Sequence, residues 1–223
     1  MDKNSANFVP LTPVSFLRRA AAVYPDKPAV IHGQRSYSYK EFQKRCCRLA
    51  SALSRRGIGP GDTVAIMAPN IPAMLEAHYG VLMLGAVLNP LNIRLDSKAI
   101  AFILQHGEAK VLISDREFAP IVTKALAELK TLALVIDIDD KMADYEPDSN
   151  DLPGEIEYED FLAEGEDNFD DCQPTDEWQT ACLLYTSGTT GNPKGVLYHH
   201  RGAYLNSLSN MAAMGLNRHS VYL

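Results

Sequence analysis

Short apolar runs alternate along this chain with longer segments of helical periodicity, and that alternation restricts the fold more than any other feature. Thr63–Ala68, Lys110–Ser114 and Leu132–Ile136 are largely apolar and have the length of strands. Segments of about 10–15 residues with one apolar face separate such strands in βαβ units. Strands that lack polar alternation are buried on both faces, as in parallel sheets covered by helices. The sequence therefore predicts an α/β fold with layered, mostly parallel sheets flanked by helices.

Local signals predict where the elements begin and end. Ser38 and Glu41 form a capping box, with Ser38 as the N-cap of a helix that ends at Gly57. Asp96 or Ser97 caps another helix. Further helices are predicted over about Pro72–Leu84, Ser97–Gln105, Glu117–Leu129 and Arg201–Met214. Further strands are predicted at Ala86–Leu88, Ala181–Thr186, Val196–Tyr198 and Ser220–Leu223.

Negative charge is concentrated in one part of the chain. Asp137–Glu177 holds 18 acidic side chains and one basic one, and the whole chain has a net charge of −7. Residues 139–177 also interrupt the alternation, with room for one short helix near Tyr158–Ala163. We interpret this segment as a solvated connection between two subdomains, and a disordered linker is the alternative.

This interruption predicts two subdomains. An N-terminal α/β subdomain would occupy residues 1–175 and include the acidic excursion 139–177, and residues 176–223 would begin a second subdomain. The chain ends within the predicted strand Ser220–Leu223, so we expect it to be part of a longer polypeptide.

Composition excludes several classes of protein. Hydrophobic residues make up 46% of the 223 residues, which is enough for a core. No stretch approaches the roughly 18 apolar residues of a membrane span, and the N-terminus has no apolar leader, so we expect a cytoplasmic protein without a membrane span. The four cysteines lack the spacing of metal ligands. Outside the acidic segment basic residues are in excess, which suits a polyphosphate ligand, but no aromatic interleaving indicates nucleic acid.

The segment TSGTTGNPKG at Thr186–Gly195 is the strongest candidate for a binding site. It follows a predicted buried strand, and its three glycines allow the backbone to approach a ligand closely. Successive N–H groups in such a turn form a nest for an anion. Lys194 adds a positive charge. Hydroxyl groups that can donate to phosphate, or complete a Mg²⁺ shell, come from Thr186, Ser187, Thr189 and Thr190.

Two other interpretations of this loop are weaker. A Walker A loop needs Gly-Lys-Ser/Thr in direct succession, whereas Gly195 follows Lys194 here. A surface turn without a ligand would need no lysine and few hydroxyls. We therefore predict a phosphate-binding loop that is not a P-loop.

With its neighbours the loop reads YTSGTTGNPKGV, which resembles the phosphate-loop signature of the adenylate-forming superfamily. That superfamily includes acyl-CoA synthetases, luciferases and the adenylation domains of peptide synthetases. Segments outside the loop that resemble family patterns are Gly59–Asn70, Leu84–Leu95 and Ile103–Asp115, and Tyr198–Leu205 is similar to the branch that activates medium-chain, branched or thioether-containing acids. Together these segments cover most of residues 14–223.

The resemblance implies that the chain is the N-terminal portion of the large domain of an AMP-forming acyl-CoA synthetase. Such an enzyme joins a fatty or related carboxylic acid to ATP, and coenzyme A then displaces AMP. The implied co-substrates are ATP and coenzyme A, with Mg²⁺ as the metal. The implied phosphate-binding residues are Thr186, Ser187, Gly188, Thr189, Thr190, Gly191 and Lys194, with Thr186 also on the Mg²⁺ side.

The same resemblance implies that no catalytic residue lies within this chain. In the family the acyl pocket, the adenine and ribose contacts and the catalytic lysine all follow the phosphate loop at a greater distance than Leu223. We therefore expect the isolated chain to be inactive.

Several alternatives stay open at this point. His199 and His200 could line the substrate side of the site, or could cap a helix and serve structure alone. Asn89 and Asn92 could line a ligand cleft at a strand end, or could belong to a plain turn. The chain could instead be a stand-alone, non-catalytic nucleotide- or phosphate-binding module, or belong to another adenylating enzyme. Exposed apolar surface could also support a homo-oligomer.

Overall fold

The computed structural model describes residues 2–129, 132–142, 152–170, 172–186 and 193–222. These residues form a seven-stranded sheet and a separate two-stranded hairpin. The strands are β1 (Pro28–His32), β2 (Arg35–Ser38), β3 (Thr63–Met67), β4 (Val87–Pro90), β5 (Ala109–Asp115), β6 (Leu134–Ile138), β7 (Ile156–Glu157), β8 (Thr180–Thr186) and β9 (Lys194–His199). The helices are α1 (Val14–Val23), α2 (Tyr39–Arg55), α3 (Pro72–Met83), α4 (Ser97–His106), α5 (Ala119–Leu126), α6 (Tyr158–Ala163) and α7 (His200–Ala213), with a 3₁₀ turn η1 at Arg116–Phe118.

The large sheet is parallel except at one edge. Its strand order is β7-β6-β5-β3-β4-β8-β9, and all neighbours run parallel apart from the antiparallel pair β8–β9. Every residue of β3 and of β6 is buried, as expected for strands covered on both faces. The predicted α/β fold with a mostly parallel sheet is therefore confirmed.

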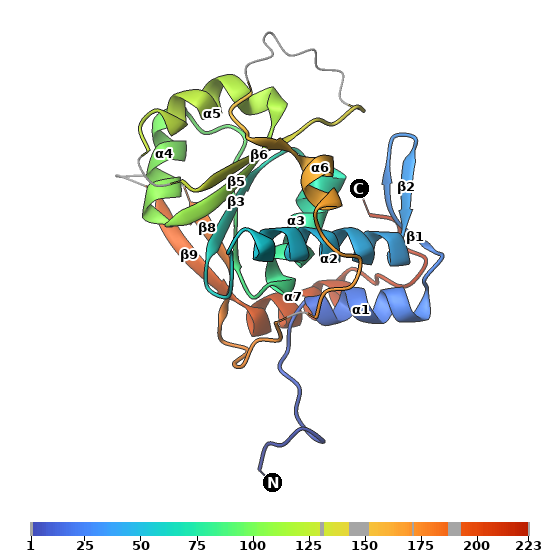
Figure 1. Cartoon of the computed structure of the whole chain (residues 1–223). Helices are drawn as coiled ribbons and strands as arrows, with labels where there is room; N and C mark the ends of the chain where they lie inside the picture. The colour runs from blue at the N-terminus through green and yellow to red at the C-terminus, as the bar shows by residue number, and fades with distance from the viewer. Residues whose placement is uncertain (1, 130–131, 143–151, 171, 187–192, 223) are drawn as a thin grey trace.

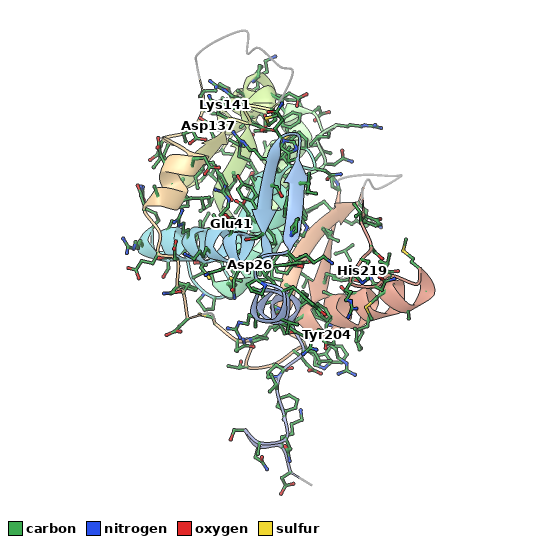
Figure 2. All side chains as sticks on the ribbon, turned by 90° about the vertical axis from the view of Figure 1, so that its right-hand side faces the viewer. Asp26, Glu41, Asp137, Lys141, Tyr204 and His219 are labelled. Atoms are coloured by element: carbon green, nitrogen blue, oxygen red, sulfur yellow. The ribbon has the colours of Figure 1, made fainter. Side chains whose placement is uncertain are left out.

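Helices cover both faces of the sheet (Figure 1). One core unites α1, α2, α3 and α6 with the sheet, and a second core packs α4 and α5 against the other face. Helix α7 lies beside α1, where the rings of Phe16 and Tyr204 stack with centroids 4.4 Å apart (Figure 2). No helix among the described residues has the length and apolar character needed to cross a bilayer.

The predicted helix starts are confirmed at two caps. The Glu41 N–H donates to Ser38 Oγ at 3.2 Å, and the Ser38 N–H donates to Glu41 Oε2 at 2.7 Å, which completes the capping box. Asp96 caps α4 by accepting from the Ala99 N–H at 2.8 Å.

Two predicted elements differ from the structure. The helix expected over Glu117–Leu129 becomes the turn η1 followed by α5, because a proline in the first turn favours a new helix start. The strand expected at Ser220–Leu223 does not form in its described part, where Val221 is 82% exposed. An apolar run becomes a strand only beside another strand that pairs with its backbone.

The described part of the acidic segment packs onto the molecule, so the disordered-linker alternative is wrong there. Helix α6 forms at the predicted residues, with Phe161 and Leu162 buried, and β7 pairs with β6. Pro147 and its neighbours at 143–151 lie outside the described residues. The division at about residue 175 stays a prediction; β8 and β9, which follow it, extend the same sheet as β3–β6.

Basic residues of α2 account for the position of the acidic segment. Lys44 and Arg48 form partly buried ion pairs with Asp167. Arg55 and the C-cap residue Arg56 form exposed ion pairs with Glu166 and Glu164. Exposed pairs of this kind contribute little each. Arg45 is different, because it bridges the fully buried Glu76 of α3 and Glu159 of α6, at 2.6 Å to each. The Tyr158 hydroxyl donates to the same Glu76 carboxylate at 2.8 Å.

We predict that Arg45→Met lowers the free energy of unfolding by about 3–5 kcal/mol, because it leaves the Glu76 carboxylate buried without its cation. Urea denaturation measures this change. Arg55→Met on the same helix is the matched control, and should have a much smaller effect because its pair with Glu166 is exposed. Equal losses for the two variants would contradict a special role for the buried pair.

Candidate functional site

The β8–β9 hairpin places the predicted phosphate loop at the carboxyl edge of the sheet. Strand β8 lies parallel to β4, so it ends at the same edge as β3, β4, β5 and β6. The two hairpin strands pair from Thr180 opposite His199 to Thr186 opposite Lys194, with a shift of register between Thr180 and Cys182. In open α/β sheets, ligands bind outside the carboxyl ends of the strands. The loop between Thr186 and Lys194 therefore starts and ends where this rule expects a ligand.

The structure brings the two ends of the predicted loop together. Thr186 and Lys194 are the last registered pair of the hairpin, and both are exposed. Directly paired residues of antiparallel strands have Cα atoms about 4.5–5.5 Å apart. No hydrogen bond or ion pair joins the Lys194 side chain to any residue that the structure describes. The predicted Ser187, Gly188, Thr189, Thr190 and Gly191 lie outside the described residues.

A contact that the sequence did not predict attaches the loop end of the hairpin to α4. The Tyr185 hydroxyl and Nδ1 of His106 are 2.7 Å apart, and Phe102 stacks on His106 with ring centroids at 5.3 Å. Burial raises the pKa of the Tyr185 phenol, so the hydroxyl stays protonated at neutral pH. The only sequence signal for this contact is the place of Tyr185 directly before the loop.

Two hollows lie near this edge, and the second of them borders the hairpin. The first, of about 410 Å³, lies where β3 and β4 end and is bordered by Asn70, His78, Pro90 and Asn92. The second, of about 400 Å³, lies between α3 and the hairpin and is bordered by His78, Pro90, Leu184 and Tyr198. They share Pro90 and His78, and the Nδ1 of His78 is 2.7 Å from the Met74 carbonyl oxygen. The carboxyl edge near the hairpin is therefore concave.

His199 and His200 lie at the end of the hairpin opposite the loop. His199 pairs with Thr180 at the start of β8, and its Nδ1 accepts from the Gly202 N–H at 2.8 Å as the N-cap of α7. His200 is 3% exposed and its Nδ1 is 3.0 Å from Thr12 Oγ1. Burial, and then the neighbouring His199, lower the pKa of His200. These contacts are those of a cap and a buried hydrogen-bonding partner, and a substrate-side role for the two histidines stays a prediction.

Asn89 and Asn92 have different environments. Asn92 is exposed and accepts from the Arg94 N–H at 2.9 Å, as in an ordinary turn. Asn89 belongs to strand β4 and is fully buried, and neither its Oδ1 nor its Nδ2 has a partner among the described residues. The plain-turn interpretation thus fits Asn92 alone.

Carboxylates gather at the far part of the same edge, around the ends of β5 and β6. Figure 2 shows Asp137 and Lys141 at this end of the molecule. Burial raises the pKa of Asp115 to about 6 and also raises the pKa of Asp137. Among the described residues, no group of three or more His, Cys, Asp or Glu side chains is placed to hold a metal ion.

Comparison with known proteins shows the family of the chain. Residues 17–223 match the family described as AMP-binding enzyme. The chain belongs to the AMP-binding enzyme family. It is 49% identical to the peroxisomal acetate/butyrate–CoA ligase AAE7 of Arabidopsis thaliana and 46% identical to the acetate–CoA ligase CCL3 of Humulus lupulus. Both alignments cover 100% of this chain and 41% of the relative, so the chain spans about two fifths of the length of these curated relatives.

Solved structures of AMP-binding enzymes share the fold. An anthranilate CoA ligase in complex with anthranoyl-AMP superposes with a TM-score of 0.76 at 24% identity, over 90% of this chain and 37% of that one. A benzoate CoA ligase from Burkholderia xenovorans gives 0.72 at 23% identity, over 88% of this chain and 36% of that one. At these identities the likeness shows the fold alone.

The relatives correct one expectation from the sequence. A cytoplasmic protein was expected from the lack of an apolar leader, but AAE7, the butyrate–CoA ligase AAE11 of Arabidopsis thaliana and the trans-cinnamate:CoA ligase of Petunia hybrida are all named as peroxisomal. An absent leader says nothing about targeting to an organelle by other signals, and the cytoplasmic prediction is wrong.

We predict that Asp115→Asn stabilises the protein at pH 7.5 by about 2 kcal/mol and has little effect near pH 4. The pKa of Asp115 is raised to about 6, so the folded state prefers the neutral carboxyl and loses stability as pH rises through 6. The amide stays neutral, and it can still accept from the Glu117 N–H as Asp115 does at 2.9 Å.

Denaturation curves for Asp115→Asn at several pH values measure this effect. Glu128→Gln, at an exposed position, is the control for loss of one negative charge. A gain that is the same at both pH values would show that burial of the charged form is not its cause.

Proposed function

We propose that the complete protein is an ATP-dependent, AMP-forming acyl-CoA ligase, and that this chain supplies its phosphate-binding hairpin. The observation that carries the proposal is the hairpin, in which an exposed Lys194 faces Thr186 at the carboxyl edge of a parallel sheet. Membership of the AMP-binding family and the CoA-ligase names of the relatives support it.

The first half of this reaction brings a carboxylate to the α-phosphate of ATP, so two anions must approach each other. Lys194 and the main-chain N–H groups of the loop would bind the β- and γ-phosphates, which lowers the repulsion and stabilises the departing pyrophosphate. The remaining loop residues Ser187, Gly188, Thr189, Thr190 and Gly191 would share this role. Thr186 would provide a hydroxyl ligand to Mg²⁺, which neutralises phosphate charge when it is bound.

The relatives also suggest a substrate class and a compartment. Three of those named above, AAE7, CCL3 and AAE11, are ligases of acetate or butyrate. We propose a short-chain carboxylic acid as the substrate of the complete protein, coenzyme A as the acceptor and the peroxisome as the location. We also propose that this chain alone is inactive, since it spans about two fifths of the length of those enzymes.

Acid-dependent exchange of pyrophosphate into ATP tests the proposal on the complete protein. The acids compared are acetate, butyrate, octanoate, cinnamate and benzoate, each with and without coenzyme A. We expect exchange with acetate or butyrate, and consumption of coenzyme A in its presence. No exchange with any of these acids, together with retained ATP binding, would replace the proposal with the non-catalytic nucleotide-binding alternative.

For the complete protein we predict that Lys194→Ala lowers the exchange rate roughly 10²-fold, the loss typical of removing one group that stabilises developing charge. The melting temperature should not change, because the Lys194 side chain is exposed. Lys98 is also an exposed lysine, but it lies on α4. Lys98→Ala is therefore the matched control and should keep the full rate. An unchanged exchange rate in Lys194→Ala would remove this lysine from the site.

A further inference from the structure

The side chain of Asn89 is an exception in an apolar core. It is fully buried, and both polar atoms of its carboxamide lack a partner among the described residues. Buried amides in native proteins are nearly always hydrogen-bonded, because an unmade bond costs the full desolvation of the group. An apolar residue of the same shape would avoid this cost to the stability of the folded state. The described conformation therefore does not explain why an amide occupies this position.

Asn89 lies on β4, the strand next to β8 of the hairpin. Its neighbour Leu88 pairs with Cys182 of β8, so Asn89 lies level with the next residue of that strand, Leu183. Gly107, at the C-terminal end of α4, closes the space between them. A Cβ atom on Gly107 would lie 3.3 Å from Nδ2 of Asn89 and 3.1 Å from Cδ2 of Leu183.

Leu183 connects this space with the strand that follows the loop. A Cβ atom on Gly195 would lie 3.1 Å from Cδ1 of Leu183, so the Leu183 side chain is wedged between Gly107 on one side and Gly195 on the other. Asn89 is therefore about three residues, or roughly 10 Å, below Thr186 along the strand direction. It does not touch the loop, and any effect on a phosphate ligand must pass through β8.

Strand β8 is held loosely on the β4 side and firmly on the β9 side. Leu88 and Cys182 are the single pair registered between β4 and β8 in the described chain, whereas β8 and β9 share six registered pairs. The reason is Pro90, the last residue of β4, which has no N–H to continue the ladder. Leu183–Thr186 thus has no registered partner on β4 among the described residues.

We propose that Asn89 is a positioning residue for ATP binding: its carboxamide forms a main-chain hydrogen bond with β8 when β8 and β9 shift toward bound nucleotide. The proposal rests on the proposed function. It explains why an amide occupies this place, since the bond that is missing in the described conformation is made in the nucleotide-bound one.

The proposal predicts opposite effects of one substitution on stability and on ATP binding. Asn89→Leu has a similar shape and removes the unpaired amide, so the melting temperature of the nucleotide-free protein should rise. The same change removes a bond made only with ATP bound, so KM for ATP should rise roughly 3–10-fold, the equivalent of one hydrogen bond. KM for the acid and for coenzyme A should stay unchanged.

The experiment uses the complete protein and measures melting with and without ATP, together with KM for each substrate. Asn89→Ala removes the amide without adding volume, and it replaces Asn89→Leu in these measurements if that variant does not fold. Asn7→Leu, at an exposed asparagine of the N-terminal segment, controls for the substitution itself.

A raised melting temperature together with a raised KM for ATP supports the proposal. An unchanged KM for ATP in both variants would overturn it and leave Asn89 as a purely structural residue. A uniform loss of stability and of affinity for all three substrates would overturn it as well. A wild-type protein that shows no acid-dependent exchange would instead refute the proposed function, so the two failures are distinguishable.

Discussion

The parallel contact between β4 and β8 is the constraint on which the candidate site depends. It places β8 so that the strand ends at the carboxyl edge, where the phosphate-loop sequence then begins. Pro90 limits this contact to a single registered pair, while β9 holds β8 along its whole length. Strand β8 of the hairpin is thus paired along β9 more extensively than along β4, and the Tyr185–His106 pair also connects it to helix α4. A binding strand attached in this way can adjust to a ligand without breaking the core.

Charge organises the opposite part of the molecule. The acidic segment carries most of the negative charge of the chain, yet its described part lies against the basic face of α2. The exposed pairs contribute little to stability one by one. Arg45, Glu76 and Tyr158 form the buried part of this contact and connect α2, α3 and α6. The described part of the acidic segment therefore covers the core, and the contact of Arg45 with Glu76 is the buried ion pair of this region.

The family of the chain is shown by comparison, while the structure describes only part of the complete protein. Membership of the AMP-binding enzyme family is shown by the match over residues 17–223. The chain spans 41% of the relatives AAE7 and CCL3, so the activity of the complete protein stays a proposal. We propose that this chain contains the phosphate-binding loop, with Thr186 and Lys194 at the two ends of the loop.

Much of the fold could be predicted because its signals are local. The capping box at Ser38 and Glu41, the apolar strands β3, β5 and β6, and the short helix α6 all follow from residues within a few positions of each other. The secondary structure of Ser220–Tyr222 could not be predicted, because an apolar run becomes a strand only if another strand is available beside it. The helix expected from Glu117 starts later for a local reason, the preference of Pro120 for the first turn of a helix.

The sequence by itself determined the class of fold, the phosphate-loop motif and the family, because each is carried by residue types at close spacing. Only the tertiary structure decided that Asn89 is buried without a partner, that His199 caps α7 away from the loop, and that Tyr185 meets His106. These facts depend on which strand lies beside which and on the register between them. Contacts between residues 79 positions apart, as in the Tyr185–His106 pair, leave no periodic trace in the sequence.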